Sequence, residues 1–162
     1  MNIIFLDYDG VVNTLWFQDV NGEPNFNFPR FEQVNNTQAI AWLNKLYREI
    51  PYSIVVTSTW RMQDNYKECL YKAGLNKNIK ILGKTKNLGT KRGIEIQDWL
   101  DNNKELQIEN FVILDDDMDM EHLIDKLVLT DTMIGINYYI YYESLQKLKG
   151  DNNNEFITRK YK

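Results

Sequence analysis

The fold is decided close to the N-terminus, by the stretch Ile3-Ile4-Phe5-Leu6-Asp7-Tyr8-Asp9-Gly10. The run from Ile3 to Leu6 is short, apolar and rich in β-branched residues, and this predicts a buried strand. Residues two apart on an extended chain point to the same side, so Asp7 and Asp9 face one small volume. Two such carboxylates repel each other unless a cation binds there or one takes up a proton. The alternative interpretation is a strand that ends in a polar Asp-Gly turn.

The composition is that of one globular domain. The chain has 162 residues, of which 43% are hydrophobic and 26% charged. This is enough for a core and does not indicate disorder. We assign residues 1–150 to a single domain and 151–162 to a tail. The single cysteine, Cys69, excludes an internal disulfide and fits a reducing, cytoplasmic location. We expect neither a signal peptide nor a membrane span.

The net charge of -4 gives no general attraction to nucleic acids or anionic membranes. A nucleic-acid role would need a local basic patch, and only residues 84–92 and the tail offer one.

Beyond the first strand, short apolar runs alternate with helical patterns. We expect a helix capped by Asn36 or Thr37 and a closing helix over residues 138–149. Further strands are predicted at residues 53–56, 79–82, 111–114 and 126–130. This alternation predicts an α/β fold with a parallel sheet and helices on both faces. Residues 14–36 are aromatic and rich in turn signals, and we interpret them as a loop or flap over the end of the first strand.

Polar residues follow three of the predicted strands. Asp7 and Asp9 follow the first, residues 57–59 (Thr-Ser-Thr) the second, and residues 115–119 (Asp-Asp-Asp-Met-Asp) the fourth. Ligands of open parallel sheets bind at this edge. A cluster of carboxylate oxygens there is suited to Mg2+, and a carboxylate beside Mg2+ can attack a phosphoryl group. A neighbouring acid can move protons, while hydroxyl groups and a cation bind the phosphoryl oxygens.

Each of these motifs also has a structural interpretation. Residues 57–59 could cap a helix, residues 115–119 could favour a helix N-terminus, and Lys91 and Arg92 could be solvated charges. If all of these interpretations were correct, the presence of the motifs together at one sheet edge would be a coincidence.

The ordered set of motifs resembles the haloacid dehalogenase-like (HAD) superfamily of Mg2+-dependent phosphohydrolases. The resemblance rests on Asp7-Tyr8-Asp9-Gly10, then Thr57, then Lys91-Arg92, then Asp115-Asp116. It implies a three-layer Rossmann-like sheet of about five strands in the order 3-2-1-4-5, without a large cap domain. A closer likeness to the HAD domains of RNA-repair ("Swiss Army Knife") proteins is carried by residues 57–61, 92–96 and 114–117.

The resemblance assigns roles to individual residues. Asp7 would be the nucleophile and Asp9 the acid/base, and Thr57 and Ser58, with Lys91 or Arg92, would bind phosphate. Mg2+ would be held by Asp7, the main-chain carbonyl of Asp9, Asp115 and, through water, Asp116. An aspartate at position 9 is typical of phosphatases and phosphomutases, so dehalogenation is not expected.

Several alternatives stay open from the sequence. The inward cation is Lys91 or Arg92, and the second acidic group is Asp116, Asp117 or Asp119. The substrate of such an uncapped, open site is a nucleic-acid end, a nucleotide or a phosphoprotein. The competing function is a non-catalytic module that binds phosphate or a partner. A two-component receiver domain is a third interpretation, but receivers, by resemblance, carry the phosphoacceptor aspartate at the end of the third strand, which here ends Ile81-Leu82-Gly83. The oligomeric state is not predicted.

Overall fold

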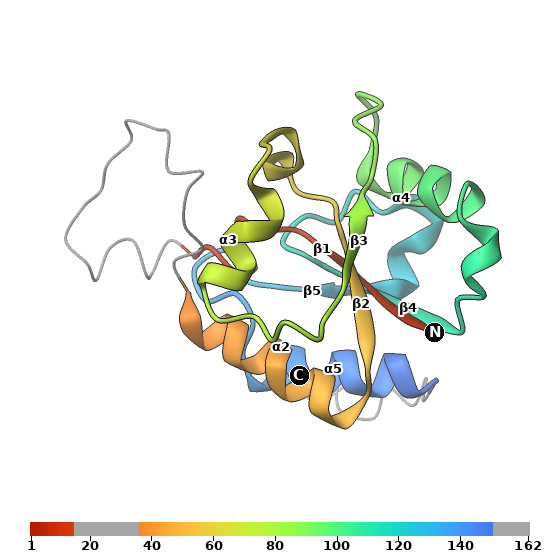
Figure 1. The fold of residues 1–162 in the computed structure, drawn as a ribbon. Helices are drawn as coiled ribbons and strands as arrows, with labels where there is room; N and C mark the ends of the chain where they lie inside the picture. Colours follow the sequence, from red (N-terminus) through yellow and green to blue (C-terminus); the bar gives the residue numbers. More distant parts are fainter. Residues whose placement is uncertain (15–35, 151–162) are drawn as a thin grey trace, which may run out of the picture.

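The computed structural model describes residues 1–14 and 36–150. This part of the chain forms a five-stranded sheet in the order β3-β2-β1-β4-β5, in which every neighbouring pair is parallel. The strands are β1 (Asn2–Leu6), β2 (Tyr52–Val56), β3 (Ile81–Lys84), β4 (Asn110–Asp115) and β5 (Leu127–Leu129). The predicted α/β fold and strand order are therefore confirmed (Figure 1).

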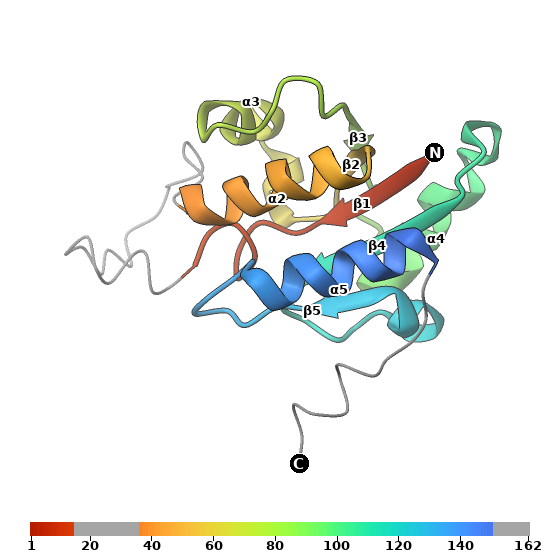
Figure 2. The same cartoon turned by 90° about the horizontal axis from the view of Figure 1, so that it is seen from below.

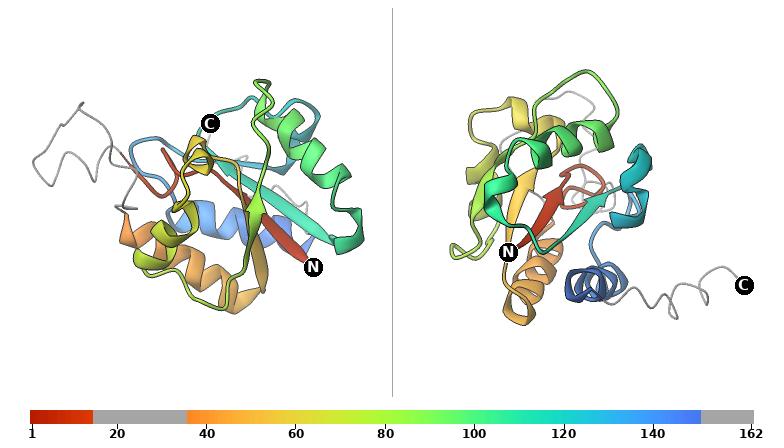
Figure 3. Two further views of the ribbon diagram at one scale, coloured as in Figure 1. Left: turned by 45° about the horizontal axis from the view of Figure 1, so that its top comes forward. Right: turned by 90° about the vertical axis from the view of Figure 1, so that its right-hand side faces the viewer.

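Helices cover both faces of this sheet. The α-helices are α2 (Thr37–Glu49), α3 (Tyr66–Lys72), α4 (Arg92–Asp101) and α5 (Tyr138–Lys149), and short 3-10 helices lie at Thr59–Met62 (η1), Lys104–Leu106 (η2) and Glu121–Lys126 (η3). Figures 2 and 3 show α2 and α5 side by side on one face and α4 on the other. Among the described residues, no helix combines the length and apolarity needed to cross a bilayer.

The central strand β1 contributes to a core on each face. Ile4 and Leu6 pack with α2, α3 and α5, whereas Ile3 and Phe5 pack with α4 and η3. This division follows from the two-residue period of side chains along a strand. Because all four side chains are fully buried, the end of β1 has little freedom to move, which fixes the residues that follow it.

Most element boundaries follow local signals in the sequence. The side chain of Asn36 caps α2 by accepting a hydrogen bond from the Ala39 amide, and α5 spans the predicted residues. Strand β3 is the exception, because it begins at Ile81 rather than at the predicted Ile79. Ile79 instead lies in a turn, where its amide bonds to the Asn76 carbonyl and its side chain enters the core. The predicted flap (14–36) and tail (151–162) fall almost entirely outside the described residues.

Candidate active site

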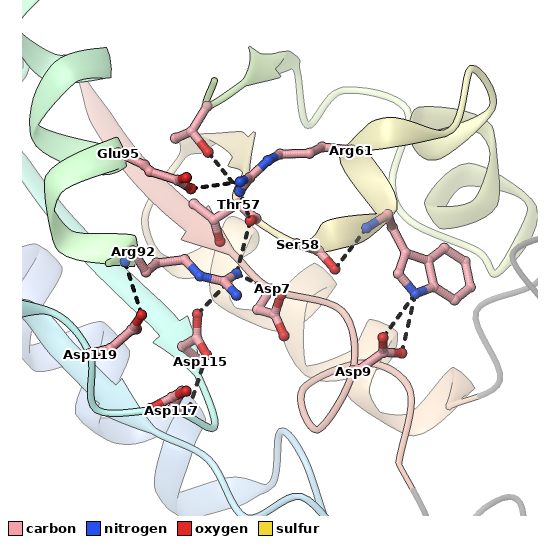
Figure 4. Close-up of polar contacts among 12 residues, drawn as sticks. Asp7, Asp9, Thr57, Ser58, Arg61, Arg92, Glu95, Asp115, Asp117 and Asp119 are labelled. Atoms are coloured by element: carbon pink, nitrogen blue, oxygen red, sulfur yellow. Dashed lines mark hydrogen bonds and ion pairs between the residues drawn. The ribbon is translucent and has the colours of Figure 1, made fainter. Parts of the chain in front are cut away.

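Three adjacent strand ends carry the candidate site, because β1 lies between β2 and β4 in the sheet. Backbone hydrogen bonds continue the ladder just beyond β1 and β2 and at the last residue of β4. The amide of Asp7 bonds to Leu114 and that of Thr57 to Leu6, while the carbonyl of Asp115 accepts from Thr130. The main chain at the site is therefore held by the sheet, and Figure 4 shows the site residues beside the strand ends.

Three predicted acidic side chains meet at this edge. Asp7, Asp115 and Asp116 each place a carboxylate oxygen within 4.8 Å of the other two. Asp7 is 5% exposed and Asp115 is fully buried. The Oδ2 atom of Asp115 is buried without a hydrogen bond, although a guanidinium lies nearby.

Burial and mutual repulsion disfavour the charged forms of these groups. Burial raises the pKa of Asp7, and it raises the pKa of Asp115 to about 7, with the neighbouring charge of Asp7 adding to the second effect. A divalent cation would relieve this cost. Because the available ligand atoms are all carboxylate oxygens, and Asp115 Oδ2 accepts no hydrogen bond, these residues fit a hard cation.

Among the described residues, Arg92 brings a positive charge to this cluster. Its NH1 atom donates to Asp7 Oδ1 at 2.8 Å and to the Thr57 carbonyl at 2.9 Å, and it lies 3.3 Å from Asp115 Oδ2. Burial alone would lower the pKa of Arg92, but the charges of Asp7 and Asp115 outweigh it and raise the pKa. Lys91 points away from the cluster, is 63% exposed and pairs with Glu121. Of the two predicted cations, the structure places Arg92 in the site.

The three aspartates that follow β4 make different contacts. Asp116 faces the cluster, and its Oδ2 accepts a hydrogen bond from the Thr132 hydroxyl at 2.7 Å. Asp119 instead caps α4 by accepting from the Arg92 amide. The carboxylate of Asp117 bonds to the next main-chain amide, that of Met118. Of these three aspartates, Asp116 is therefore the one that the structure brings to Asp7 and Asp115.

Gly10 allows Asp116 to approach. A Cβ atom at position 10 would lie 2.1 Å from the Asp116 carboxylate, and the φ angle of Gly10 is +73°. Both observations require glycine, since other residues rarely adopt this backbone conformation.

Thr57 and Ser58 follow β2 and are fully buried or nearly so. The hydroxyl oxygen of Thr57 is buried without a hydrogen-bond partner among the described residues. Ser58 caps η1 by accepting from the Trp60 amide, so the helix-cap interpretation applies to this residue. The Ser58 hydroxyl lowers the pKa of the Asp7 carboxyl, against the larger effect of burial.

Asp9 stands apart from the cluster of Asp7, Asp115 and Asp116. Its side chain is exposed. The indole Nε1 of Trp60 donates to both of its oxygens, at 3.2 and 3.1 Å, and Asn13 Nδ2 donates to Oδ1 at 3.2 Å. Figure 4 shows this carboxylate directed toward Trp60.

Two further contributors, Glu95 and Thr132, are not among the site residues predicted from the sequence. Glu95 forms a buried ion pair with Arg61 at 2.6 Å, and Arg61 also bonds to the Thr57 carbonyl. A glutamate inside an apolar helix pattern is a weak indication of such a pair, because its partner lies in a different part of the chain.

The comparison with known families agrees with this geometry. A sequence model of one family, described as the HAD domain in Swiss Army Knife RNA repair proteins, matches residues 3–139. The chain belongs to this family. No curated protein and no solved structure matched the chain.

The matched range of this HAD domain contains every residue of the candidate site, from Asp7 to Thr132. The strand order also separates it from receiver domains, which have the doubly wound order 2-1-3-4-5. The receiver interpretation is therefore excluded.

Proposed function

We propose that this HAD domain is a Mg2+-dependent phosphatase, which hydrolyses phosphate monoesters through an aspartyl-phosphate on Asp7. The observation that carries the proposal is the meeting of Asp7, Asp115 and Asp116 with the Arg92 guanidinium at adjacent strand ends. A carboxylate nucleophile needs positive charge around the phosphoryl group that it attacks.

The residues divide the work as follows. Asp7, Asp115 and Asp116 would hold the cation, which when bound would offset charge on the phosphoryl oxygens. Arg92 directs its guanidinium between Asp7 and Asp115, where it can both orient the nucleophile and bind the substrate. The hydroxyl of Thr57, which has no hydrogen-bond partner among the described residues, can donate to a phosphoryl oxygen. Asp9 would protonate the leaving oxygen and later accept a proton from water.

For the substrate we propose the phosphorylated end of a nucleic acid, with nucleotides and phosphoproteins as the competing classes. The family description refers to RNA repair proteins, which supports the first class. The net charge of -4 means that affinity for a nucleic acid must come from local contacts rather than from the whole surface.

Hydrolysis of p-nitrophenyl phosphate with and without Mg2+ tests the reaction. Asp7→Asn removes the nucleophile and should lower kcat by at least about 10³-fold, since covalent catalysis is lost. Asp101→Asn is the matched control, because Asp101 is exposed and pairs with Lys104 at the surface. Equal rates for wild type and Asp7→Asn would refute the proposal.

A panel of phosphorylated oligonucleotides, nucleotides and phosphopeptides then ranks the substrate classes by kcat/KM. The absence of turnover across the whole panel, with phosphate binding retained, would instead support a non-catalytic binding module.

A further inference from the structure

The contact between Asp9 and Trp60 joins the segment after β1 to the segment after β2. We propose that Trp60 is a positioning residue, which holds the carboxylate of Asp9 where it can act as the acid/base of the hydrolysis. This inference rests on the proposed function, and it adds a residue to which no role has been given.

The fold leaves the indole of Trp60 little freedom. Trp60 lies in η1, whose first turn is capped by Ser58. Its side chain is only 3% exposed. The ring packs against Tyr8 with centroids 5.2 Å apart, and the hydroxyl of Tyr8 bonds in turn to the Tyr66 carbonyl. The indole N–H is therefore a rigid donor, aimed at an otherwise exposed carboxylate.

Trp60 lies in the segment that follows β2, and Asp9 lies in the segment that follows β1, so the contact joins the chain beyond two neighbouring strands. The indole N–H only donates, so it can hold the Asp9 carboxylate without competing for the proton that Asp9 transfers.

The position of Asp9 suits the side of the leaving group. In phosphoryl transfer the attacking and leaving oxygens lie roughly in line on opposite sides of phosphorus. The proton donor must then stand away from the nucleophile. Asp9 fulfils this condition, because it is exposed and outside the acidic cluster, whereas Asp7 is buried within it.

The reaction balances with these residues. A carboxylate oxygen of Asp7 bonds to phosphorus while the bond from phosphorus to the leaving oxygen breaks, and that oxygen takes the proton of the Asp9 carboxyl. Water then attacks phosphorus and gives a proton to the Asp9 carboxylate as the bond to Asp7 breaks. The products are an alcohol and inorganic phosphate, and both aspartates return to their starting forms.

The experiment compares Trp60→Phe with wild type on two substrates. The phenyl ring keeps an aromatic packed against Tyr8 but removes the N–H donor. A poor leaving group, such as an alkyl phosphate, depends on protonation far more than p-nitrophenyl phosphate does. We expect kcat to fall about tenfold on the alkyl phosphate and much less on p-nitrophenyl phosphate, with KM unchanged, because only proton transfer is impaired.

Trp99→Phe is the matched control. Trp99 lies on α4 and packs edge-on against Phe5. Any change in kcat that its replacement causes should therefore be the same for both leaving groups. Trp60→Phe should also have no further effect in the Asp9→Asn background, since a positioning residue acts only through its partner. An equal loss on both substrates, or full additivity with Asp9→Asn, would show that Trp60 is merely structural.

A spectroscopic measurement covers the case in which Trp60→Phe does not fold. The chain has four tryptophans, and in Asp9→Asn one indole N–H resonance should shift while the others stay in place. No shift would overturn the proposal. The two proposals fail separately: an active Asp7→Asn refutes the phosphatase, whereas an inactive Asp7→Asn with a Trp60→Phe that behaves like Trp99→Phe refutes only the role of Trp60.

Discussion

At the scale of single residues, neighbours in the sequence have unrelated environments. Lys91 and Arg92 are adjacent cations at the start of α4, but only Arg92 reaches Asp7 and Asp115. Lys91 is the N-cap residue and has an extended backbone, whereas Arg92 is the first helical residue, so their side chains leave the chain in different directions. Lys91 makes an ion pair with Glu121 at the surface, which is typically worth at most about 1 kcal/mol.

Arg92→Met should therefore lower the rate of p-nitrophenyl phosphate hydrolysis by about 10²- to 10³-fold, because the charge that stabilises the transferring phosphoryl group is lost. Lys91→Met is the control and should retain a rate close to that of wild type. Steady-state kinetics of the two purified variants at saturating Mg2+ check this expectation. A larger loss in Lys91→Met than in Arg92→Met would contradict the assignment of the inward cation.

At the scale of elements, α4 is held against the strand ends by three independent contacts. Asp119 caps its first turn, and Gly93 lets the Met120 carbonyl approach so closely that a Cβ would lie 2.1 Å from it. Deeper along the helix, Glu95 pairs with Arg61 of η1. Because Arg61 also bonds to the Thr57 carbonyl, which Arg92 shares, this ion pair connects both groups that we assign to phosphate binding.

Glu95→Gln should destabilise the fold by about 3–5 kcal/mol, since it leaves a buried guanidinium without a countercharge. The matched control on the same helix is Asp98→Asn, which removes an exposed ion pair with Lys86 and should cost less than about 1 kcal/mol. Urea unfolding of the two variants and wild type measures the difference. Similar losses in both would mean that the buried pair contributes no more than a surface pair.

At the scale of the whole molecule, the buried carboxylates of the site lower the stability of the metal-free fold. The sheet brings buried carboxylates to the end of its central strand, and the pKa of Asp115 rises from 3.8 to about 7 mainly through burial. The native state without metal then holds a proton that the unfolded chain releases. Stability therefore falls as the pH rises from about 4 to about 7, and the loss is complete above that range.

Asp115→Asn should make the metal-free protein more stable than wild type at pH 8, and the difference should shrink toward pH 4. The rise in pKa from 3.8 to about 7 sets an upper limit of about 4 kcal/mol for the effect at pH 8. Urea unfolding in EDTA at several pH values measures it, with the exposed Asp101→Asn as the control.

Mg2+ at pH 8 should reverse the order, because a ligand that binds only the native state stabilises wild type and not the variant. A wild-type protein that is equally stable at pH 5 and pH 8 without metal would contradict this account.

The sequence by itself determined the order of strands and helices and the strand ends that carry polar residues. These features follow from local signals: apolar runs, caps such as Asn36, and the rule that parallel strands present their carboxyl ends at one edge. Through the resemblance to HAD domains it also predicted the aspartates and Thr57 as site residues. It placed β3 two residues too early, because a buried turn residue, Ile79, is as apolar as a strand.

Only the tertiary structure decided which side chains face one another. The choice of Arg92 over Lys91, of Asp116 over Asp117 and Asp119, and the contact of Trp60 with Asp9 depend on how helices and turns pack on the sheet. Arg92 and Asp7 are separated by 85 residues, and Trp60 and Asp9 by 51. The local sequence pattern shows which face of a helix or strand is apolar. It does not show how one element is oriented against another, because that orientation is set by the packing of the two cores.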